Sequence, residues 1–365
     1  MNARNMVLCV AVVALVVWGA TACGRPVLPD PDPEILPAEE VPEGLEAFRE
    51  NIMSGGPPPD GIPPIETPQY QPLDAVGDRL HDDDVVFVVE ATEGVFVYPQ
   101  TILVWHEIVN ETFDGVLSSL TYCPLTGSAI GYRGRIGDVE TTFGTSGKLV
   151  NSNLVMYDRD TDSYWPQVLG RAVEGDYTGR KLETFPVIWT RWHRVKAHYG
   201  EASVLTEGTG FLRDYTRDPY GSYRESGNYY DSGSPMFPVM AEDHRFEPKT
   251  VVIGGWVNDQ PFAIPKETLQ QDPVLAFSFE DHALLAVYDM PLDTVRVFLL
   301  PGGEGGGDWN VDEERFRDRT SGNSWTLRGE QIDSPSGGNG LPMVESFDVM
   351  WFAWFAFHPE TTVHG

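Results

Sequence analysis

The strongest constraint on the fold is a set of short patterns that occur twice, in the same order and with the same spacing. A Tyr-Pro pair at 98–99 precedes a Tyr-Cys-Pro-Leu motif at 122–125 by 24 residues, and an Ile-Pro pair at 264–265 precedes a Tyr-Asp-Met-Pro-Leu motif at 288–292 by the same 24. Asp-Arg…Trp and Trp…Glu…Val patterns also recur. These matches predict an internal duplication. The alternative is coincidence, because aromatic, strand-rich chains repeat short patterns by accident.

Most of the remaining pattern is typical of strands. Runs of β-branched and aromatic residues bounded by turn residues lie at 84–90, 117–122, 141–143, 154–158, 251–257, 275–279, 284–288 and 294–300. Short helices are expected at 187–198 and 347–357. We therefore expect an α+β fold that is predominantly β, with two pseudo-repeated β-rich lobes, each with one short helix, packed as one body.

The N-terminus has the pattern of a targeting segment. An apolar run at 7–18 follows Arg4, and small residues then lead to Cys23. This predicts a signal peptide over 1–22. The residues before Cys23 are similar to a bacterial lipobox, although Ala20 stands where leucine is usual, so Cys23 is the expected lipidation site. The protein is then expected outside the cytoplasm, as a lipoprotein anchored to the cell membrane or envelope; an uncleaved anchor is the alternative.

Composition divides the rest of the chain. Residues 23–72 carry the lipidated Cys and are rich in proline and acids, which predicts an extended tether. A first β-rich repeat with the candidate site is expected at 73–210. A Tyr/Arg/Asp-rich connecting segment at 211–262 leads to a second, degenerate repeat at 263–365.

Acidic residues greatly outnumber basic ones. The 365 residues include 25 Lys and Arg against 55 Asp and Glu, a formal net charge of −30. Such a chain offers no basic face for phosphates, so we expect no nucleic-acid partner. The charge is typical of a protein kept soluble at high salt, and halophily is one interpretation. An ordinary acidic extracytoplasmic protein is the other.

A tight turn between two expected strands carries the reactive-site hypothesis. Cys123 is the single cysteine beyond the predicted leader and its lipidation site, so no internal disulfide is expected. The thiol is a candidate nucleophile, with His106 as base and Glu107 or Asn110 to orient that base. The following backbone amides are a candidate anion hole: Thr126, Gly127 and Ser128. Alternatively, Cys123 is a small buried hydrophobe beside a core histidine.

The second copy lacks this thiol. Cys123 aligns roughly with 289–290, and 126–128 aligns with 293–295. The second copy is therefore expected to be structural, and any site to lie in the first copy or at the seam between the lobes.

Two further segments supply candidate ligand-binding residues. Ser146 and Lys148 lie in a glycine-flanked loop expected at 144–148, which can cradle an anion, and Asn153 extends its polar surface. A plain hairpin turn is the alternative.

The long segment at 213–230 is rich in Tyr, Arg and Asp. It offers Arg213 and Tyr220 to a ligand or partner, or else it staples the two lobes together. His244 follows and brings a second histidine to the seam, unless it lies on a surface turn. A soft, copper-like metal set of Cys123 and His106, with Met156 or His244, is a further hypothesis.

Several motifs together resemble one family. They are Trp-His-Glu-Ile-Val-Asn at 105–110, Tyr-Cys-Pro-Leu-Thr-Gly-Ser-Ala at 122–129, Phe-Gly-Thr-Ser-Gly-Lys-Leu at 143–149, Ser-Asn-Leu-Val-Met-Tyr-Asp-Arg at 152–159 and Ser-Tyr-Trp-Pro-Gln at 163–167. The chain resembles the domain-of-unknown-function 3179 family from about residue 85 onward. The resemblance implies an exported or envelope-associated protein and no established activity. Some members have Cys-Pro-Leu-Cys, and Thr126 at the second cysteine leaves no dithiol here.

Three functions stay open from the sequence. One is a module that binds a small molecule or protein around Cys123, on the outer face of the membrane that its lipid anchor contacts. Another is a cysteine-centred enzyme or thiol-redox protein, and the third is a metal-binding protein. Whether the protein is an enzyme, which cofactor it uses and which small molecule or protein it meets are unknown at this stage.

Overall fold

The computed structural model describes residues 44–300, 309–312, 315–318, 322, 324–328, 331–333 and 340–365. The predicted signal peptide, Cys23 and the first part of the predicted tether lie outside these residues. Within the described ranges, no helix is both long enough and apolar enough to cross a membrane.

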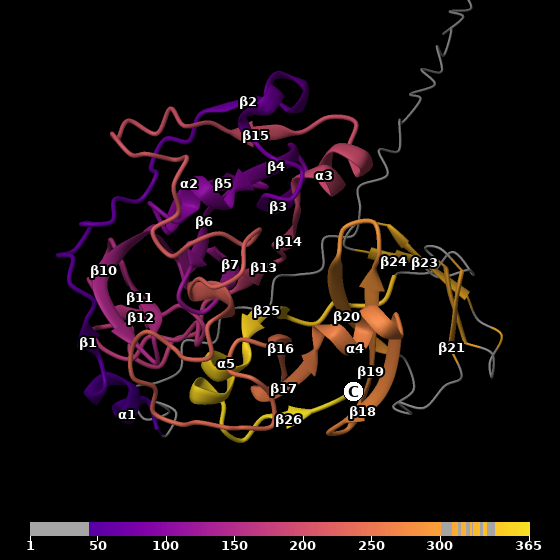
Figure 1. Cartoon of the computed structure of the whole chain (residues 1–365). Helices are drawn as coiled ribbons and strands as arrows, with labels where there is room; N and C mark the ends of the chain where they lie inside the picture. Colours follow the sequence, from indigo (N-terminus) through magenta and orange to yellow (C-terminus); the bar gives the residue numbers. More distant parts are fainter. Residues whose placement is uncertain are drawn as a thin grey trace, which may run out of the picture. The chain divides into compact units, whose positions relative to one another are not determined.

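The first half of the described chain is built on a hairpin and a three-stranded meander (Figure 1). The elements are β3 (Val85–Ala91), β4 (Gly94–Pro99), α2 (Gln100–Leu103), β5 (Ile108–Phe113), β6 (Val116–Cys123) and β7 (Ser128–Arg133). The Cys123 turn joins β6 to β7, at the end of that meander.

Further strands complete three sheets, ordered β14-β3-β4-β15-β2, β13-β7-β6-β5 and β1-β10-β11-β12. Their added elements are α1 (Leu45–Glu50), β1 (Met53–Ser54), β2 (Tyr70–Pro72), β10 (Phe143–Val150), β11 (Asn153–Asp158), β12 (Tyr164–Pro166), β13 (Thr184–Phe185), β14 (Ile188–Arg191), α3 (Trp192–His198) and β15 (Ser203–Leu205). A small ribbon, β8 (Arg135–Ile136) with β9 (Val139–Glu140), stands apart.

The second half forms sheets ordered β25-β16-β17-β26, β18-β19-β20 and β21-β22-β23-β24. Its elements are β16 (Val251–Val257), β17 (Gln260–Pro265), α4 (Lys266–Gln271), β18 (Val274–Phe279), β19 (His282–Asp289), β20 (Thr294–Leu300), β21 (Trp309–Asp312), β22 (Arg315–Asp318), β23 (Ser324–Arg328), β24 (Gln331–Asp333), β25 (Ser346–Met350), α5 (Trp351–Phe357) and β26 (Thr362–Val363). The predominantly β, α+β class expected from the sequence is confirmed.

The two halves share their element order and their strand pairing. β14 and β25 run antiparallel to β3 and β16, whereas β15 and β26 run parallel to β4 and β17. Cys123 pairs with Ser128 across the first turn, and Asp289 pairs with Thr294 across the second. This shared topology supports the predicted duplication, which stays a proposal, as do its boundaries. The pairing also corrects the alignment of the two turns by one residue. Ser128 corresponds to Thr294 and not, as expected from the sequence, to Val295.

The helix expectations need correction. The segments 187–198 and 347–357 each begin as strands, β14 and β25, before α3 and α5 start. Side chains of β14 alternate between buried and half-buried positions, which is a strand period. Each half also has a second short helix, α2 or α4, after a proline. One helix per lobe was therefore too few.

The proline-rich residues from 44 onward are packed rather than extended as a free tether. Ile65 is 1% exposed, and the Gly55 N–H donates to the Gly147 carbonyl at 2.8 Å. Gly147 has φ +71°, and a Cβ there would lie 1.9 Å from the Pro57 carbonyl oxygen. The expected loop at 144–148 is thus the middle of β10, with a bulge between Thr145 and Lys148 that admits this segment.

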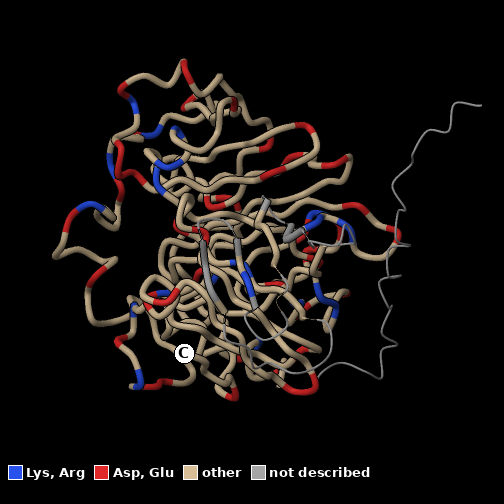
Figure 2. Tube along the Cα trace, turned by 90° about the vertical axis from the view of Figure 1, so that its right-hand side faces the viewer, with Lys and Arg blue, Asp and Glu red and all other residues tan. Residues whose placement is uncertain are grey.

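Asp and Glu residues lie on many of the surface loops, as Figure 2 shows. Asp84, part of the acidic run at 82–84, is buried and pairs with Arg224 at 3.1 Å. The acidic surface is therefore mostly solvated, with local exceptions where a carboxylate is paired.

Candidate functional site

The Cys123 turn is closed by a buried hydrogen-bond network. The Thr126 and Ser128 hydroxyls lie 2.8 Å apart, and Ser128 donates to the Gln167 side-chain oxygen at 2.7 Å. The Asn153 amide donates to Thr126 at 3.0 Å and to Gln167 at 2.9 Å. These side chains satisfy one another. Of the backbone amides predicted as an anion hole, the Thr126 N–H donates to the Cys123 carbonyl at 3.3 Å.

Other parts of the chain hold the same turn in place. The Met350 N–H, at the end of β25, donates to the Thr126 carbonyl at 2.9 Å. The Tyr229 hydroxyl donates to the Leu125 carbonyl at 2.6 Å, and the Lys249 ammonium lies 3.2 Å from the centre of the Tyr229 ring. The second half and the connecting segment therefore fix the turn of the first half.

Cys123 itself is 1% exposed, and its sulfur accepts the Leu154 N–H at 3.4 Å. Burial, and to a lesser degree the nearby Glu107 carboxylate, raises the pKa of the thiol to about 11. A reactive cysteine needs the opposite shift, toward the thiolate. This environment is that of a small buried side chain.

His106 is engaged away from the thiol. Its Nδ1 lies 2.7 Å from the Pro63 carbonyl and its Nε2 lies 2.7 Å from the Tyr215 hydroxyl. A carbonyl only accepts, so Nδ1 carries the proton and Nε2 accepts from the hydroxyl. Burial lowers the pKa of the ring, which is neutral at pH 7. With both nitrogens occupied, His106 is not placed to serve as a base for Cys123.

Glu107 differs from Cys123 and His106 in its backbone conformation and in the surroundings of its side chain. It is 7% exposed and adopts φ +59°, which a side chain with a Cβ rarely does. Its N–H donates to the Leu103 carbonyl at 2.7 Å and its carbonyl accepts the Tyr122 N–H at 2.7 Å. These bonds hold it between α2 and β5. Burial raises the pKa of the carboxyl to about 8, and no described residue forms a hydrogen bond or ion pair with that side chain.

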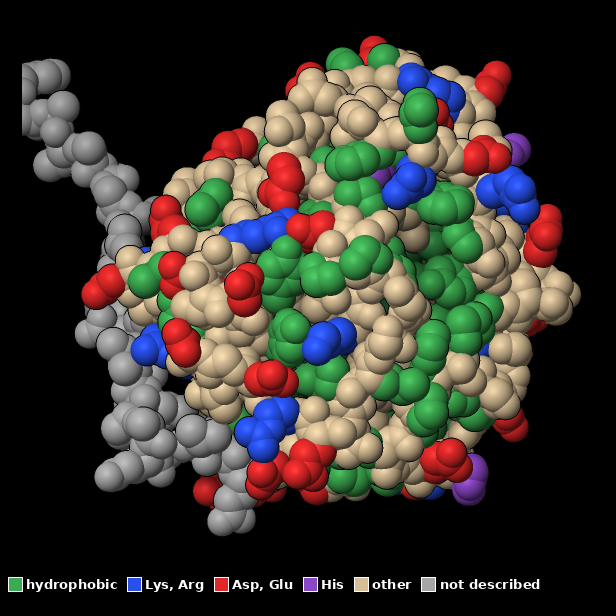
Figure 3. Space-filling model, turned by 90° about the vertical axis from the view of Figure 1, so that its left-hand side faces the viewer, with side chains coloured by type: hydrophobic (Ala, Val, Ile, Leu, Met, Phe, Trp, Pro, Cys, Tyr) green, Lys and Arg blue, Asp and Glu red, His purple; other side chains and the backbone are tan. Residues whose placement is uncertain are grey.

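The Glu107 carboxyl opens onto a cavity of about 220 Å³, which we call the Glu107 cavity. Three parts of the chain supply its walls, and the lining includes Ile62, Leu125, Lys148, Leu154, Tyr220 and Phe237. Most of these side chains are apolar. Figure 3 views the side of the molecule on which β1 and β10 lie, where hydrophobic side chains gather in a broad band.

The cavity brings together three of the residues predicted from the sequence. They are Glu107, Lys148 and Tyr220, with Cys123 directly behind the Leu125 and Leu154 walls. Burial raises the pKa of Tyr220 well above its ordinary value, and the charges of Glu107 and Cys123 add to this effect. A carboxyl and a phenol side chain therefore line one small, largely apolar space, while the Lys148 ammonium lies over the Tyr164 ring, 4.6 Å from its centre.

The remaining predicted residues lie elsewhere. Ser146 accepts the Lys148 N–H at 3.1 Å and is buried in β10, while Gly127 lines a different cavity. Arg213 is exposed and donates to the Leu212 carbonyl at 3.2 Å, and His244 is exposed. Within the described ranges, no group of three or more His, Cys, Asp or Glu side chains is placed to hold a metal. Both ring nitrogens of His106 are occupied and His244 is exposed, so the predicted soft metal set is not assembled.

The tyrosines of the connecting segment face inward. The Gln100 amide donates to the Asp218 carboxylate at 2.8 Å and to the hydroxyls of Tyr122 and Tyr230 at 3.1 and 3.2 Å. The Tyr223 and Tyr230 rings stack at 3.8 Å. This segment therefore packs onto the first half and fills space beside Gln100.

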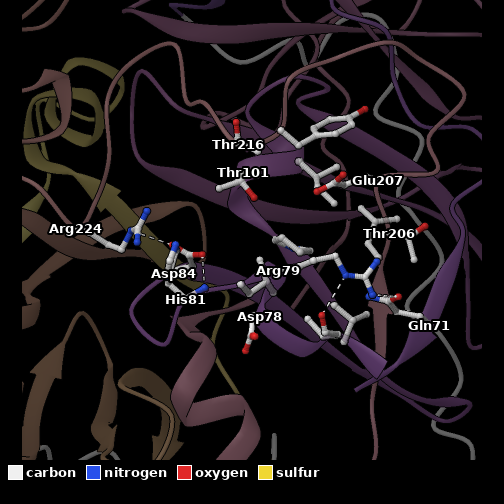
Figure 4. Close-up of a pocket in the computed structure, with 17 residues that line it drawn as sticks. Gln71, Asp78, Arg79, His81, Asp84, Thr101, Thr206, Glu207, Thr216 and Arg224 are labelled. Carbon is white, nitrogen blue, oxygen red and sulfur yellow. Dashed lines mark hydrogen bonds and ion pairs between the residues drawn. The ribbon is translucent and has the colours of Figure 1, made fainter. Parts of the chain in front are cut away.

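A larger cavity, of about 330 Å³, lies between β2, β15 and the connecting segment. Figure 4 shows two pairs in its lining, Arg224 with Asp84 and Arg79 with Gln71, and draws Asp78 and Glu207 without a partner. The Arg79 guanidinium also donates to the Val76 carbonyl at 3.1 Å. Asp78 and Glu207 are exposed, so this cavity gives weaker reason to expect a ligand than the nearly buried Glu107.

The family model described as "Protein of unknown function (DUF3179)" matches residues 59–361. The chain belongs to the DUF3179 family. No curated protein and no solved structure matches it. The DUF3179 match begins within the proline-rich stretch, close to the packed Ile65. Since the family has no stated activity, the function of this DUF3179 protein has to be argued from the site.

The sequence reading missed Gln167, Leu154 and Phe237. Gln167 is the centre of the buried network and stood only among the family-like motifs. Phe237 reaches the cavity from the connecting segment, where no periodic pattern marks it as buried. A signal for Gln167 was available, since a glutamine next to a strand Trp-Pro pair is an unusual polar residue in an apolar context.

Proposed function

We propose that this DUF3179 protein is an exported, lipid-anchored binding protein whose small-molecule ligand occupies the Glu107 cavity beside Cys123. One observation carries the proposal: a nearly buried carboxyl, which no described residue pairs with, belongs to the lining of that cavity. Burying a polar group without a hydrogen bond costs on the order of 1–3 kcal/mol. The positive φ of Glu107 adds a cost of about 1 kcal/mol. A folded protein tolerates such free-energy costs where a bound ligand supplies the missing hydrogen-bond partner.

The lining defines what the ligand offers. Apolar walls suit a compact hydrocarbon or aromatic body, and the protonated Glu107 carboxyl both donates and accepts one hydrogen bond. The Lys148 ammonium lies over the Tyr164 ring, 4.6 Å from its centre, so Glu107 is the group that orients the ligand. A small carboxylic acid or amide with an apolar body fits this set of groups.

The N-terminal pattern supports export and anchoring. An apolar run ending in small residues before Cys23 is what a cleaved, lipidated leader has. Labelling cells with radioactive palmitate tests this part of the proposal. Label on the wild-type protein and none on Cys23→Ser is expected, whereas an unlabelled wild-type protein excludes a lipid anchor at Cys23.

Binding is tested with a library of small carboxylic acids and amides, screened by ligand-observed NMR against the wild-type protein. Hits are expected to lose at least tenfold in affinity with Glu107→Leu and to keep their affinity with the control Cys123→Ala. A screen without wild-type hits, or hits unaffected by Glu107→Leu, contradicts the proposal.

The binding proposal and the cysteine-centred alternative predict different reactivity for the Cys123 thiol. We expect iodoacetamide to modify Cys123 only after unfolding, because the thiol is buried and its pKa is raised to about 11. Rapid modification of the native protein, with an apparent pKa below about 8.5, favours the enzyme or redox function instead.

A further inference from the structure

A second cavity, of about 370 Å³, lies at the seam between the two halves, and we call it the seam cavity. Trp189, Arg191 and Tyr223 line it from the first half and the connecting segment. Lys266, Gln270 and Asp348 line it from the second half. It shares no lining residue with the Glu107 cavity, so the two are separate sites.

A buried ion pair lines the seam cavity. The Lys266 ammonium donates to the Asp348 carboxylate at 2.7 Å, and each residue is 8% exposed. An ammonium has three protons, and among the described residues Lys266 meets this one partner. The carboxylate likewise has lone pairs beyond the one that the ammonium uses. The pair therefore presents a donor and an acceptor side by side.

The first half shows what the same position looks like when it is filled. Gln100 and Lys266 are equivalent, because each follows the proline that pairs with Val86 or Val252. The Gln100 amide meets three acceptors, and Tyr230 and Asp218 of the connecting segment occupy the space around it. At Lys266 the corresponding space is the seam cavity.

Aromatic rings form another part of the wall. Trp189 and Tyr223 are both half-buried, and their rings meet edge to face with centroids 5.5 Å apart. Asp293 and Glu267 add carboxylates, and the Gln270 amide donates to Asp293 at 3.1 Å. The cavity thus combines flat apolar surface with closely spaced donors and acceptors.

We infer that the seam cavity binds a neutral ring bearing several hydroxyl groups, such as one sugar unit of a saccharide. Neighbouring hydroxyls each donate and accept, and so they match the paired Lys266 and Asp348, while the C–H face of the ring lies against the aromatic wall. Three carboxylates, Asp348, Asp293 and Glu267, disfavour an anion. A neutral ring can use the donors and the acceptors of the lining together.

Saturation-transfer NMR tests the inference with four probes: glucose, galactose, N-acetylglucosamine and cellobiose. At least one is expected to bind the full chain, with its ring protons saturated. Gln270→Ala is expected to weaken that binding severalfold, and Lys266→Met combined with Asp348→Leu to abolish it. Both partners are replaced together because removing one leaves a buried charge that threatens the fold.

The matched control removes an exposed Lys–Asp pair, by Lys196→Met with Asp82→Leu, whose atoms lie 2.6 Å apart. Sugar binding is expected to survive this change. No saturation of any probe in the wild-type protein overturns the inference. So does binding that persists in the Lys266/Asp348 variant, or displacement of the sugar by millimolar phosphate at constant ionic strength. None of these outcomes bears on the Glu107 cavity.

Discussion

The turn at Cys123 and the turn at Asp289 share a backbone but are stabilised by different chemistry. Gly127 has φ +55° and its counterpart Asp293 has φ +54°. In the first half a neutral network of hydroxyls and amides surrounds the turn. In the second half Asp289 accepts the Leu292 N–H at 3.2 Å and lies 3.5 Å from Arg296. The backbone therefore does not require a thiol, and the thiol does not by itself identify a site.

A more informative difference between the two halves lies beside the turns, at Glu107 and its counterpart Pro273. The Glu107 carbonyl accepts the Tyr122 N–H, and the Pro273 carbonyl accepts the Tyr288 N–H at 2.9 Å, so the two residues are equivalent. The ring of proline fixes φ near −65°, which excludes the conformation that Glu107 adopts. A strained, unpaired carboxyl is thus present in the first half and impossible at its counterpart.

The largest change in the free energy of unfolding is expected at Asp289, the residue equivalent to Cys123. Asp289→Ala leaves the buried Arg296 guanidinium without its nearer carboxylate and should lower the free energy of unfolding by about 4 kcal/mol. Urea unfolding of the full chain measures this loss. Asp289→Ala with Arg296→Met, which removes both charges, is expected to recover most of it. A loss below about 1 kcal/mol would show that the pair is not needed.

Glu107→Gln should remove a pH dependence. The folded carboxyl has a pKa of about 8, raised by burial from the ordinary value of 4.5. Between these values the unfolded chain has released the proton and the folded protein keeps it, so the wild-type free energy of unfolding falls as pH rises. The expected fall is about 3 kcal/mol from pH 5 to pH 8, and it ends above the folded pKa.

Unfolding free energies of wild type and Glu107→Gln across that range give the measurement. Their difference is expected to grow with pH. A constant difference would mean that the carboxyl has an ordinary pKa and is not buried as described.

Gly127→Ala is expected to cost about 2 kcal/mol. The new Cβ would occupy a left-handed backbone and lie 3.1 Å from the Met350 Cε. Asp293→Asn is the control in the second half, since a Cβ is already accommodated there at nearly the same φ, and it should change the melting temperature far less. Equal shifts in the two variants would contradict the distinction between the turns.

The smallest effect is expected for Cys123→Ala, about 1 kcal/mol, because the variant loses one buried sulfur atom and a weak hydrogen bond from Leu154. Urea unfolding measured beside Asp289→Ala tests the comparison directly. A loss as large as that of Asp289→Ala would make the thiol an essential part of the turn.

Local patterns predicted the strands well and the site only in part. Runs rich in β-branched and apolar residues, bounded by turn residues, mark β3, β6 and β16 in the sequence itself, and each strand is buried over a continuous stretch. The expected loop at 144–148 failed because Gly147 and its polar neighbours have the composition of a turn. Their place in β10 depends on the close approach of Pro57, which lies far away in the chain.

The site depended still more on tertiary contacts. The hypothesis of one reactive set combined Cys123, His106 and Glu107, because they lie in two successive motifs of the first repeat. Their roles were separated by groups that no local pattern reveals, such as Pro63 and Tyr215 at His106. Glu107 became the main candidate only because, in the part of the chain that the structure describes, no residue pairs with its carboxyl.

The bond from Met350 to the Thr126 carbonyl has a consequence for how the chain acquires its structure. A chain made from its N-terminus exposes the Cys123 turn long before β25 exists. Closing the turn must wait for a partner more than 200 residues later, a contact of very high sequence separation that slows folding. During that interval the apolar ends of β6 and β7 are uncovered, so a chaperone that shields this hairpin would increase the yield of folded protein more than one acting on the C-terminal strands.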